Sequence, residues 1–92
     1  MQNKYTVELT RGARAALRKM DAHDSRTILS WLHSKLEGCT NPRQFGKALA
    51  GNRAGEWRCR VGDYRVIAEI QDDKVLVLVL AIDHRRNVYR ET

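Results

Sequence analysis

The feature that most constrains the fold is Gly62-Asp63, a two-residue connection between two runs of alternating, strand-like residues. A glycine in so short a turn supplies the positive φ angle that closes an antiparallel hairpin. With these two residues as the turn, Arg60 lies opposite Arg65, and Arg58 shares their face of the sheet. Like charges directly opposite one another destabilise a strand pair by roughly a few tenths of a kcal/mol. The three arginines therefore predict a bound anion, and a phosphate is the candidate.

Length, charge and cysteine content limit the class of protein. The 92 residues predict a single domain, residues 1–92, with one modest core. A formal charge of +6 favours a polyanion or an acidic protein as partner. Cys39 and Cys59 lack metal-ligand and CxxC spacing, and no apolar signal segment follows Met1, which predicts a reduced, cytoplasmic protein. The longest apolar run, residues 75–82, is too short to span a bilayer, so no membrane partner is expected.

The apolar spacing upstream of the hairpin predicts one strand and two helices. Residues 4–9 alternate as a half-buried strand does. The first helix is predicted from residues three and four apart behind a polar cap: Thr10, Ala13, Ala16, Leu17 and Met20. For the second helix we expect Asp21 or Asp24 as the cap, Gly38 at the end, and an apolar face of Ile28, Leu29, Leu32 and Leu36. Residues 39–55 are predicted to be mostly loop.

Three strands are predicted after that loop, at Glu56–Val61, Tyr64–Gln71 and Lys74–Ile82. A tight turn at Asp72-Asp73 is expected to join the last two, which sets Arg65 opposite Leu80. The last strand is apolar on both faces and is therefore placed beside the first strand as well. The predicted fold is α+β, in the order β-α-α-β-β-β, with a helical hairpin on one face of a four-stranded, mainly antiparallel sheet. The helix-side residues are Val66, Ala68, Ile70, Val75, Val77 and Val79, and the arginines lie on the other face.

Three segments together resemble the RelE/ParE superfamily of bacterial type II toxin–antitoxin toxins. They are Lys47-Ala-Leu-Ala-Gly51, the run from Trp57 to Ile67, and Ile82-Asp-His-Arg-Arg-Asn-Val-Tyr89. The resemblance covers nearly the whole chain. It implies an activity of one of two kinds. Members of the RelE branch cut the mRNA codon in the ribosomal A site, whereas members of the ParE branch poison DNA gyrase and have generally lost the nuclease residues.

The resemblance assigns roles to particular residues. Arg65 and Arg85 match the arginines that stabilise the scissile phosphate, and Tyr89 matches a tyrosine that stacks on the substrate or assists proton removal. Arg58 and Arg60 match two basic positions that are lysines in the best-known ribosome-dependent member. A guanidinium group does not readily give up its proton, so these two arginines are expected only to hold phosphates.

Proton removal is then predicted to fall to Tyr89, His84 or Asp83, of which histidine ionises nearest to neutral pH. The catalytic residues that we predict are Arg65, Arg85 and Tyr89, and the RNA-binding residues are Arg58, Arg60, His84 and Arg86. The alternatives are structural: a solvated, ion-paired strand face for the arginines of the hairpin, a basic surface turn for the last two, and a core position for the tyrosine.

The other aromatic and sulfur-containing side chains read as structural. Trp57 and Tyr64 alternate to the face away from the arginines and are predicted to lie in the core rather than to stack on bases. Trp31 lies beside the apolar stripe of the second helix, where partial burial or antitoxin contact is expected. Cys59 is predicted to be buried and inert.

The favoured function is therefore a toxin endoribonuclease that cleaves ribosome-bound mRNA by 2′-hydroxyl attack, without a metal ion or another cofactor. The first alternative is a gyrase poison, and the second is a DNA-binding corepressor that acts with its antitoxin. The resemblance implies ribosome, mRNA and a cognate antitoxin as partners, and operator DNA bound through the antitoxin. We expect the antitoxin's contacting segment to be amphipathic and acidic, and to cover any exposed side chains among Leu76, Leu78 and Leu80.

Overall fold

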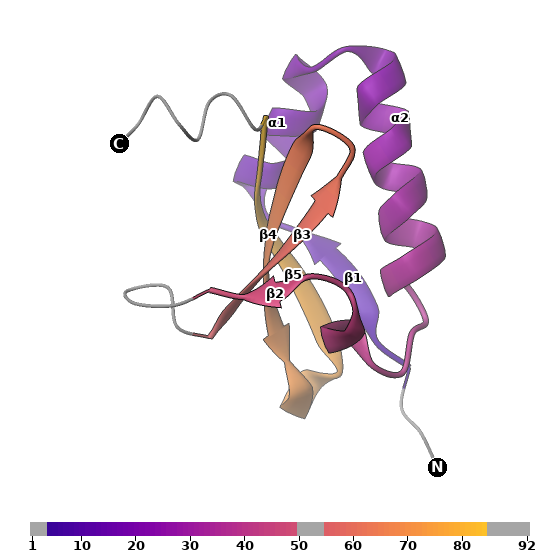
Figure 1. Cartoon of the computed structure of the whole chain (residues 1–92), viewed down its shortest axis with the longest axis vertical. Coiled ribbons are helices and arrows are strands. Elements are labelled where there is room, and N and C mark those ends of the chain that lie inside the picture. The colour runs from indigo at the N-terminus through magenta and orange to yellow at the C-terminus, as the bar shows by residue number, and fades with distance from the viewer. Residues whose placement is uncertain (1–3, 50–54, 85–92) are drawn as a thin grey trace.

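In the computed structural model, which describes residues 4–49 and 55–84, two helices cover one face of a five-stranded sheet (Figure 1). The strands lie in the order β1-β5-β4-β3-β2, with β1 parallel to β5 and the other neighbours antiparallel. The elements are β1 Thr6–Leu9, α1 Arg11–Lys19, α2 Ala22–Trp31, β2 Lys47–Ala48, β3 Glu56–Val61, β4 Tyr64–Gln71 and β5 Leu76–His84. The predicted α+β class is confirmed, and the predicted strand count of four is short by one.

Thr10 fixes both the start of α1 and its place on the sheet. Its Oγ1 accepts a hydrogen bond from the backbone N–H of Ala13 at 3.2 Å, as an N-cap does. The same hydroxyl donates to the carbonyl of Leu80 in β5 at 2.9 Å. Ala13 and Leu17 are buried, so the predicted apolar stripe faces the sheet. One side chain thus ties the first helix to β5.

The second helix departs from its prediction in three details. Asp21 stands at the N-cap position of α2 without a side-chain cap hydrogen bond, and α2 continues into a π-helical segment at Leu32–Leu36. Gly38 follows with a φ angle of +80°, which suits glycine and ends the helical run as predicted. Leu29 is 42% exposed, so its assignment to the buried face was wrong. Within the described residues, no helix is long and apolar enough to cross a bilayer.

The hairpin of β3 and β4 has the predicted register. Val61 pairs with Tyr64, Arg60 with Arg65, and Cys59 with Val66. Gly62 has a φ angle of +60°, which the tight turn requires. Local turn chemistry therefore determines the pairing of this part of the sheet.

The next pairing differs from the prediction. The link from β4 to β5 is a 3₁₀ turn at Asp72–Lys74 followed by Val75 in the left-handed conformation, with a φ angle of 51°, rather than a two-residue turn. A register shift also occurs between Ile67 and Ala68. As a result Arg65 lies opposite Asp83 instead of Leu80.

A short fifth strand lies within the segment predicted as loop. Lys47 pairs with Arg58, and Ala48 with Trp57. The chain reaches this pairing through Gly46, whose φ angle is +94° and whose missing side chain leaves room for the Arg58 carbonyl: a Cβ atom there would lie 2.1 Å from the carbonyl oxygen. Only glycine fits such a close approach.

The core lies between the sheet and the two helices. Its buried apolar residues are Ala13, Leu17, Ile28, Leu32, Leu36, Cys59, Val61, Val66, Ala68, Val77, Val79 and Ile82. Of the residues predicted for this face, Ile70 is only half-buried, and Val75 lies in the turn, outside the strand. Trp57 and Tyr64 pack against the core as predicted.

A polar cluster ties the start of the chain to the turn before β5. The Tyr5 hydroxyl donates to Asp72 Oδ1 at 2.6 Å, and Arg43 holds both oxygens of the same carboxylate at 2.8–2.9 Å. The hydrogen bonds from Arg43 and Tyr5 lower the pKa of Asp72 from 3.8 to about 2. The ionised carboxylate is therefore favoured in the folded protein.

We expect Asp72→Asn to destabilise the protein at pH 7 and to matter less in acid. Because the pKa of Asp72 is depressed on folding, its carboxylate stabilises the fold above about pH 4, and this contribution is lost as the pH falls towards 2. Urea unfolding of both proteins between pH 7 and pH 2 measures the difference. Asp73→Asn, at an exposed neighbouring position, is the matched control. An unfolding difference that stays constant down to pH 2 would contradict this account.

Candidate functional site

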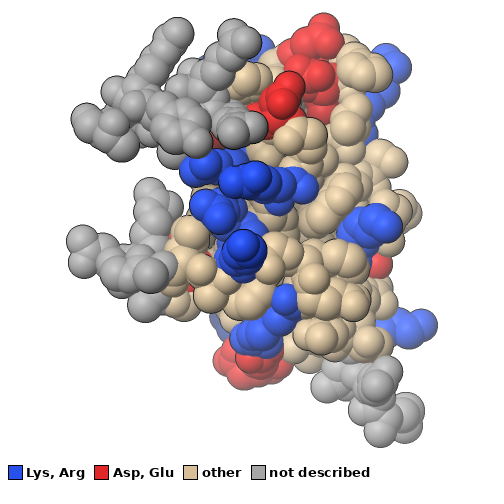
Figure 2. Space-filling view, viewed as in Figure 1, with Lys and Arg blue, Asp and Glu red and all other residues tan. Residues whose placement is uncertain are grey.

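Four cations meet on the face of the sheet that the helices leave open. We call Lys47, Arg58, Arg60 and Arg65 the basic face. They form two adjacent like-charge pairs, Lys47 opposite Arg58 and Arg60 opposite Arg65. Figure 2 shows lysine and arginine side chains gathered over this part of the sheet. Each such pair weakens the sheet slightly, so the arrangement gains most when an anion lies between the cations.

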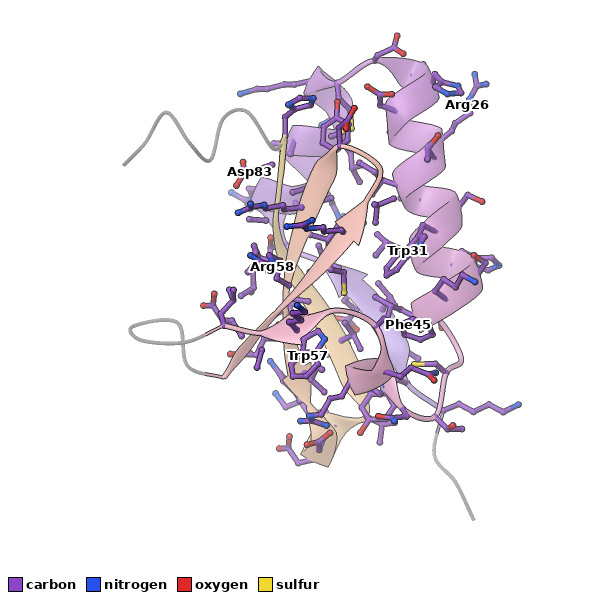
Figure 3. The ribbon with its side chains drawn as sticks, in the orientation of Figure 1. Arg26, Trp31, Phe45, Trp57, Arg58 and Asp83 are labelled. Atoms are coloured by element: carbon purple, nitrogen blue, oxygen red, sulfur yellow. The ribbon has the colours of Figure 1, made fainter. Side chains whose placement is uncertain are left out.

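One carboxylate lies at the edge of the basic face. Asp83 is exposed and stands opposite Arg65 on the neighbouring strand, on the same side of the sheet as Arg58 (Figure 3). Further along the same face, Glu56 stands opposite Glu69 on the neighbouring strand. The open face is thus basic towards the β3–β4 turn and acidic towards the other end, which orients a bound polyanion.

His84 lies on the other side of the sheet. Its ring packs edge-to-face on Tyr64, with the ring centroids 5.0 Å apart, and the Tyr64 hydroxyl donates to Asp24 of α2 at 2.9 Å. Burial raises the pKa of Tyr64, and the hydrogen bond to Asp24 raises it further. The structure therefore does not bring His84 together with the arginines as predicted, because β5 extends to this residue and alternation places it on the helix side.

A groove of about 500 Å³ opens where β3 faces the C-terminal half of α2. Trp31 and Phe45 form its aromatic wall. Their rings meet edge to face, with the ring centroids 6.0 Å apart. Lys47, Arg58 and Arg60 also line the groove, and we call them its rim. In Figure 3 the two aromatic side chains lie on the opposite side of β3 from Arg58. The basic face therefore continues around the edge of the sheet into an aromatic groove.

Cys59 does not supply reactive chemistry to this groove. It is 2% exposed, its thiol donates to the Phe45 carbonyl at 3.3 Å, and burial raises its pKa to about 11. Its predicted burial is confirmed. Within residues 4–49 and 55–84, no three His, Cys, Asp or Glu side chains are grouped so that they could hold a metal ion.

Three predicted site residues, Arg85, Arg86 and Tyr89, lie outside the described residues, and their roles stay predictions. The residues that the sequence reasoning missed are Lys47 and the groove wall of Trp31 and Phe45. The sequence carries no alternation that signals the short edge strand, because a strand of two residues is too short to show one.

Comparisons with known proteins give consistent matches. The sequence model of the family described as ParE toxin of the type II toxin–antitoxin system, parDE, matches residues 7–89. Toxin RelG of Mycobacterium tuberculosis is 33% identical over 86 residues, which cover 94% of this chain and 97% of the relative.

Solved structures match as well. A chain of the toxin–antitoxin complex RelBE2 from M. tuberculosis has a TM-score of 0.82 and 30% identity, covering 92% of this chain and 98% of that one. A mutant of E. coli toxin RelE in the free state has a TM-score of 0.72 at 22% identity, covering 97% of this chain and 94% of that one, and it supports the fold alone. The chain therefore belongs to the RelE/ParE superfamily and is a toxin of a type II toxin–antitoxin system.

Proposed function

We propose that the protein is a metal-independent endoribonuclease that cleaves mRNA in the ribosomal A site and so inhibits translation. The observation that carries the proposal is the basic face, where two like-charge pairs stand side by side on an open sheet. Such pairs are costly in an unliganded protein and favourable around a phosphodiester. The similarity to toxin RelG supports a RelE-type activity.

The basic face suits the electrostatic part of RNA cleavage. Attack by a 2′-hydroxyl on the adjacent phosphate forms the bond from phosphorus to the 2′ oxygen and breaks the bond to the 5′ oxygen, which leaves with a proton. The transition state carries additional negative charge on the phosphate oxygens, and fixed cations stabilise that charge. Arg65 is half-buried at the β4 side of the basic face, with Arg60 opposite it on one neighbouring strand and Asp83 on the other, so its position is well defined. We assign Arg65 and, by family resemblance, Arg85 to the scissile phosphate. Lys47, Arg58 and Arg60 anchor the flanking strand.

The proton steps require a second group. Of the three residues considered from the sequence, Asp83 lies beside Arg65, His84 lies on the far side of the sheet, and Tyr89 lies outside the described residues. We therefore assign proton removal to Tyr89, the position that the family resemblance selects. Asp83 is placed to orient the guanidinium of Arg65.

We expect His84→Phe to leave cleavage within about threefold of the wild type, because phenylalanine keeps the edge-to-face contact with Tyr64. A general base increases the reaction rate by about 10²- to 10⁴-fold, so the assay easily separates a structural role of His84 from a role as general base. Initial rates of mRNA cleavage in a translation extract measure the effect, with Tyr89→Phe as the variant expected to lose activity. A hundredfold loss of cleavage rate in a folded His84→Phe protein would mean that His84 takes part in the reaction.

A second candidate function is inhibition of DNA gyrase, because the family model that matches residues 7–89 is that of the ParE toxins. The two functions predict different products. In parallel assays with the purified chain, the nuclease yields mRNA fragments in a translation extract and leaves gyrase supercoiling unchanged. A gyrase poison stabilises DNA cleavage complexes without mRNA fragments, and that result would replace our proposal.

We also propose a cognate antitoxin as partner, by analogy with the RelBE2 complex of M. tuberculosis. Its contacting segment would be acidic where it covers the basic face, and apolar over Leu76, Leu78 and Leu80, which are half-buried. Operator DNA would bind to the complex through the antitoxin. A ribosomal target places the toxin in the cytoplasm.

A further inference from the structure

The aromatic groove beside the basic face combines two kinds of recognition. Trp31 and Phe45 are both half-buried and form an apolar wall, and Lys47, Arg58 and Arg60 stand along the rim. The volume of about 500 Å³ lies within the range of small-ligand sites, about 300–1,000 Å³. An aromatic wall next to several cations matches a ligand that has both a flat ring and a negative charge.

The wall of the groove is held in place by the backbone. The Phe45 carbonyl accepts hydrogen bonds from Trp57 Nε1 and from the Cys59 thiol, which fix the chain just before β2. Gly46 then passes against the Arg58 carbonyl, at a distance that excludes any side chain. Phe45 and Lys47 are therefore both held against β3, as residues of a preorganised binding site are.

We propose that this groove binds one nucleotide of single-stranded RNA, with the base against Trp31 and Phe45 and its phosphate at Lys47, Arg58 and Arg60. The inference rests on the proposed function, since it adds a subsite next to the site where Arg65 holds the scissile phosphate of the RNA. Single-stranded RNA is recognised through bases stacked on aromatic side chains, with cations along the backbone.

Continuity with the basic face favours RNA over an acidic peptide. Arg58 and Arg60 belong to the groove rim and also to the two like-charge pairs, in which their partners are Lys47 and Arg65. Neighbouring β-strands lie about 5 Å apart. Consecutive phosphates of one RNA chain can therefore reach Arg65 and the groove rim together. An acidic peptide would use the same cations but has no base to place against Trp31.

The test uses the full chain without ribosomes and an uncleavable probe, a fluorescein-labelled 2′-O-methyl hexaadenylate. Its affinity is compared by fluorescence anisotropy with that of an abasic oligomer of the same length and charge. We expect wild type to prefer the base-containing probe about 5- to 100-fold, since one stacked base contributes this much to affinity. Trp31→Ala is expected to remove that preference. Leu29→Ala, an exposed apolar position on the same helix, is expected to keep it.

The outcomes separate the subsite from the proposed function. Equal affinity of wild type for the two probes would overturn the inference, whether or not Trp31→Ala folds. In a competition assay, displacement of the labelled hexaadenylate by hexaglutamate as effectively as by unlabelled hexaadenylate would show that the groove recognises negative charge alone, as in binding an acidic peptide. That result would also overturn the inference. If the base preference is present but no mRNA is cut on ribosomes, the proposed function fails and the subsite stands.

Discussion

Replacing Arg65 with alanine is expected to lower ribosome-dependent mRNA cleavage by about 10²- to 10³-fold, the usual cost of removing one group that stabilises transition-state charge. Arg65 lies at the β4 side of the basic face, between Arg60 of β3 and Asp83 of β5. The substitution also relieves the repulsion between Arg60 and Arg65, so part of any loss of side-chain packing is offset. Initial cleavage rates in a translation extract measure the effect.

The control for this prediction is Arg18→Ala, which removes an exposed cation from α1 and leaves the sheet untouched. It lowers the net charge by the same amount, so it separates a local role from general attraction to RNA. Equal losses for the two variants would mean that net charge, rather than the basic face, drives the activity. Unaltered cleavage by a folded Arg65→Ala protein would remove Arg65 from the reaction.

Gly46→Ala is expected to destabilise the protein by about 2–5 kcal/mol, a large part of the roughly 5–15 kcal/mol that stabilises a small domain. Two effects combine. The φ angle of +94° is unfavourable for alanine by about 1–2 kcal/mol, and the new Cβ atom would lie 2.1 Å from the Arg58 carbonyl oxygen. Relieving that overlap must move β2 away from β3 and with it Lys47, at a further cost of about 1–3 kcal/mol.

Gly38→Ala is the matched control for this stability prediction. Gly38 has a φ angle of +80°, but a Cβ atom there would meet nothing within 4 Å, so only the conformational cost of about 1–2 kcal/mol applies. Urea unfolding compares the two variants. Equal destabilisation would mean that the contact between Gly46 and Arg58 does not hold β2 in place.

The hairpin of β3 and β4 could be predicted because its information is local. Gly62-Asp63 selects a tight turn, and the turn fixes Arg60 opposite Arg65. The helix signals were local in the same way, since Thr10 caps α1 and Gly38 ends the second helical run. Alternation then placed the arginines and the core valines on opposite faces.

The parts that could not be predicted depend on contacts between distant residues. A two-residue strand such as Lys47–Ala48 has no measurable periodicity and exists because Gly46 lets the chain approach Arg58. The β4–β5 register depends on a longer turn ending at Val75 and on an irregularity at Ile67, neither of which the apolar pattern reveals.

The observed position of His84 differs from the expected one beside the arginines for a related reason, and its role stays a prediction. The last strand was expected to end at Ile82, but it continues to His84, and the pleat then decides on which side the ring lies. The groove wall was missed because its two aromatic residues come from a helix and a loop that meet only in the folded protein.

The most direct test of the central claim is a map of mRNA 3′ ends from purified ribosomes that hold one defined codon in the A site. New 3′ ends are expected within that codon when the wild-type chain is added. With Arg65→Ala these ends are expected to form about 10²- to 10³-fold more slowly, and none are expected on the same mRNA without ribosomes. Intact A-site codons after addition of the folded wild-type chain would contradict the proposed cleavage.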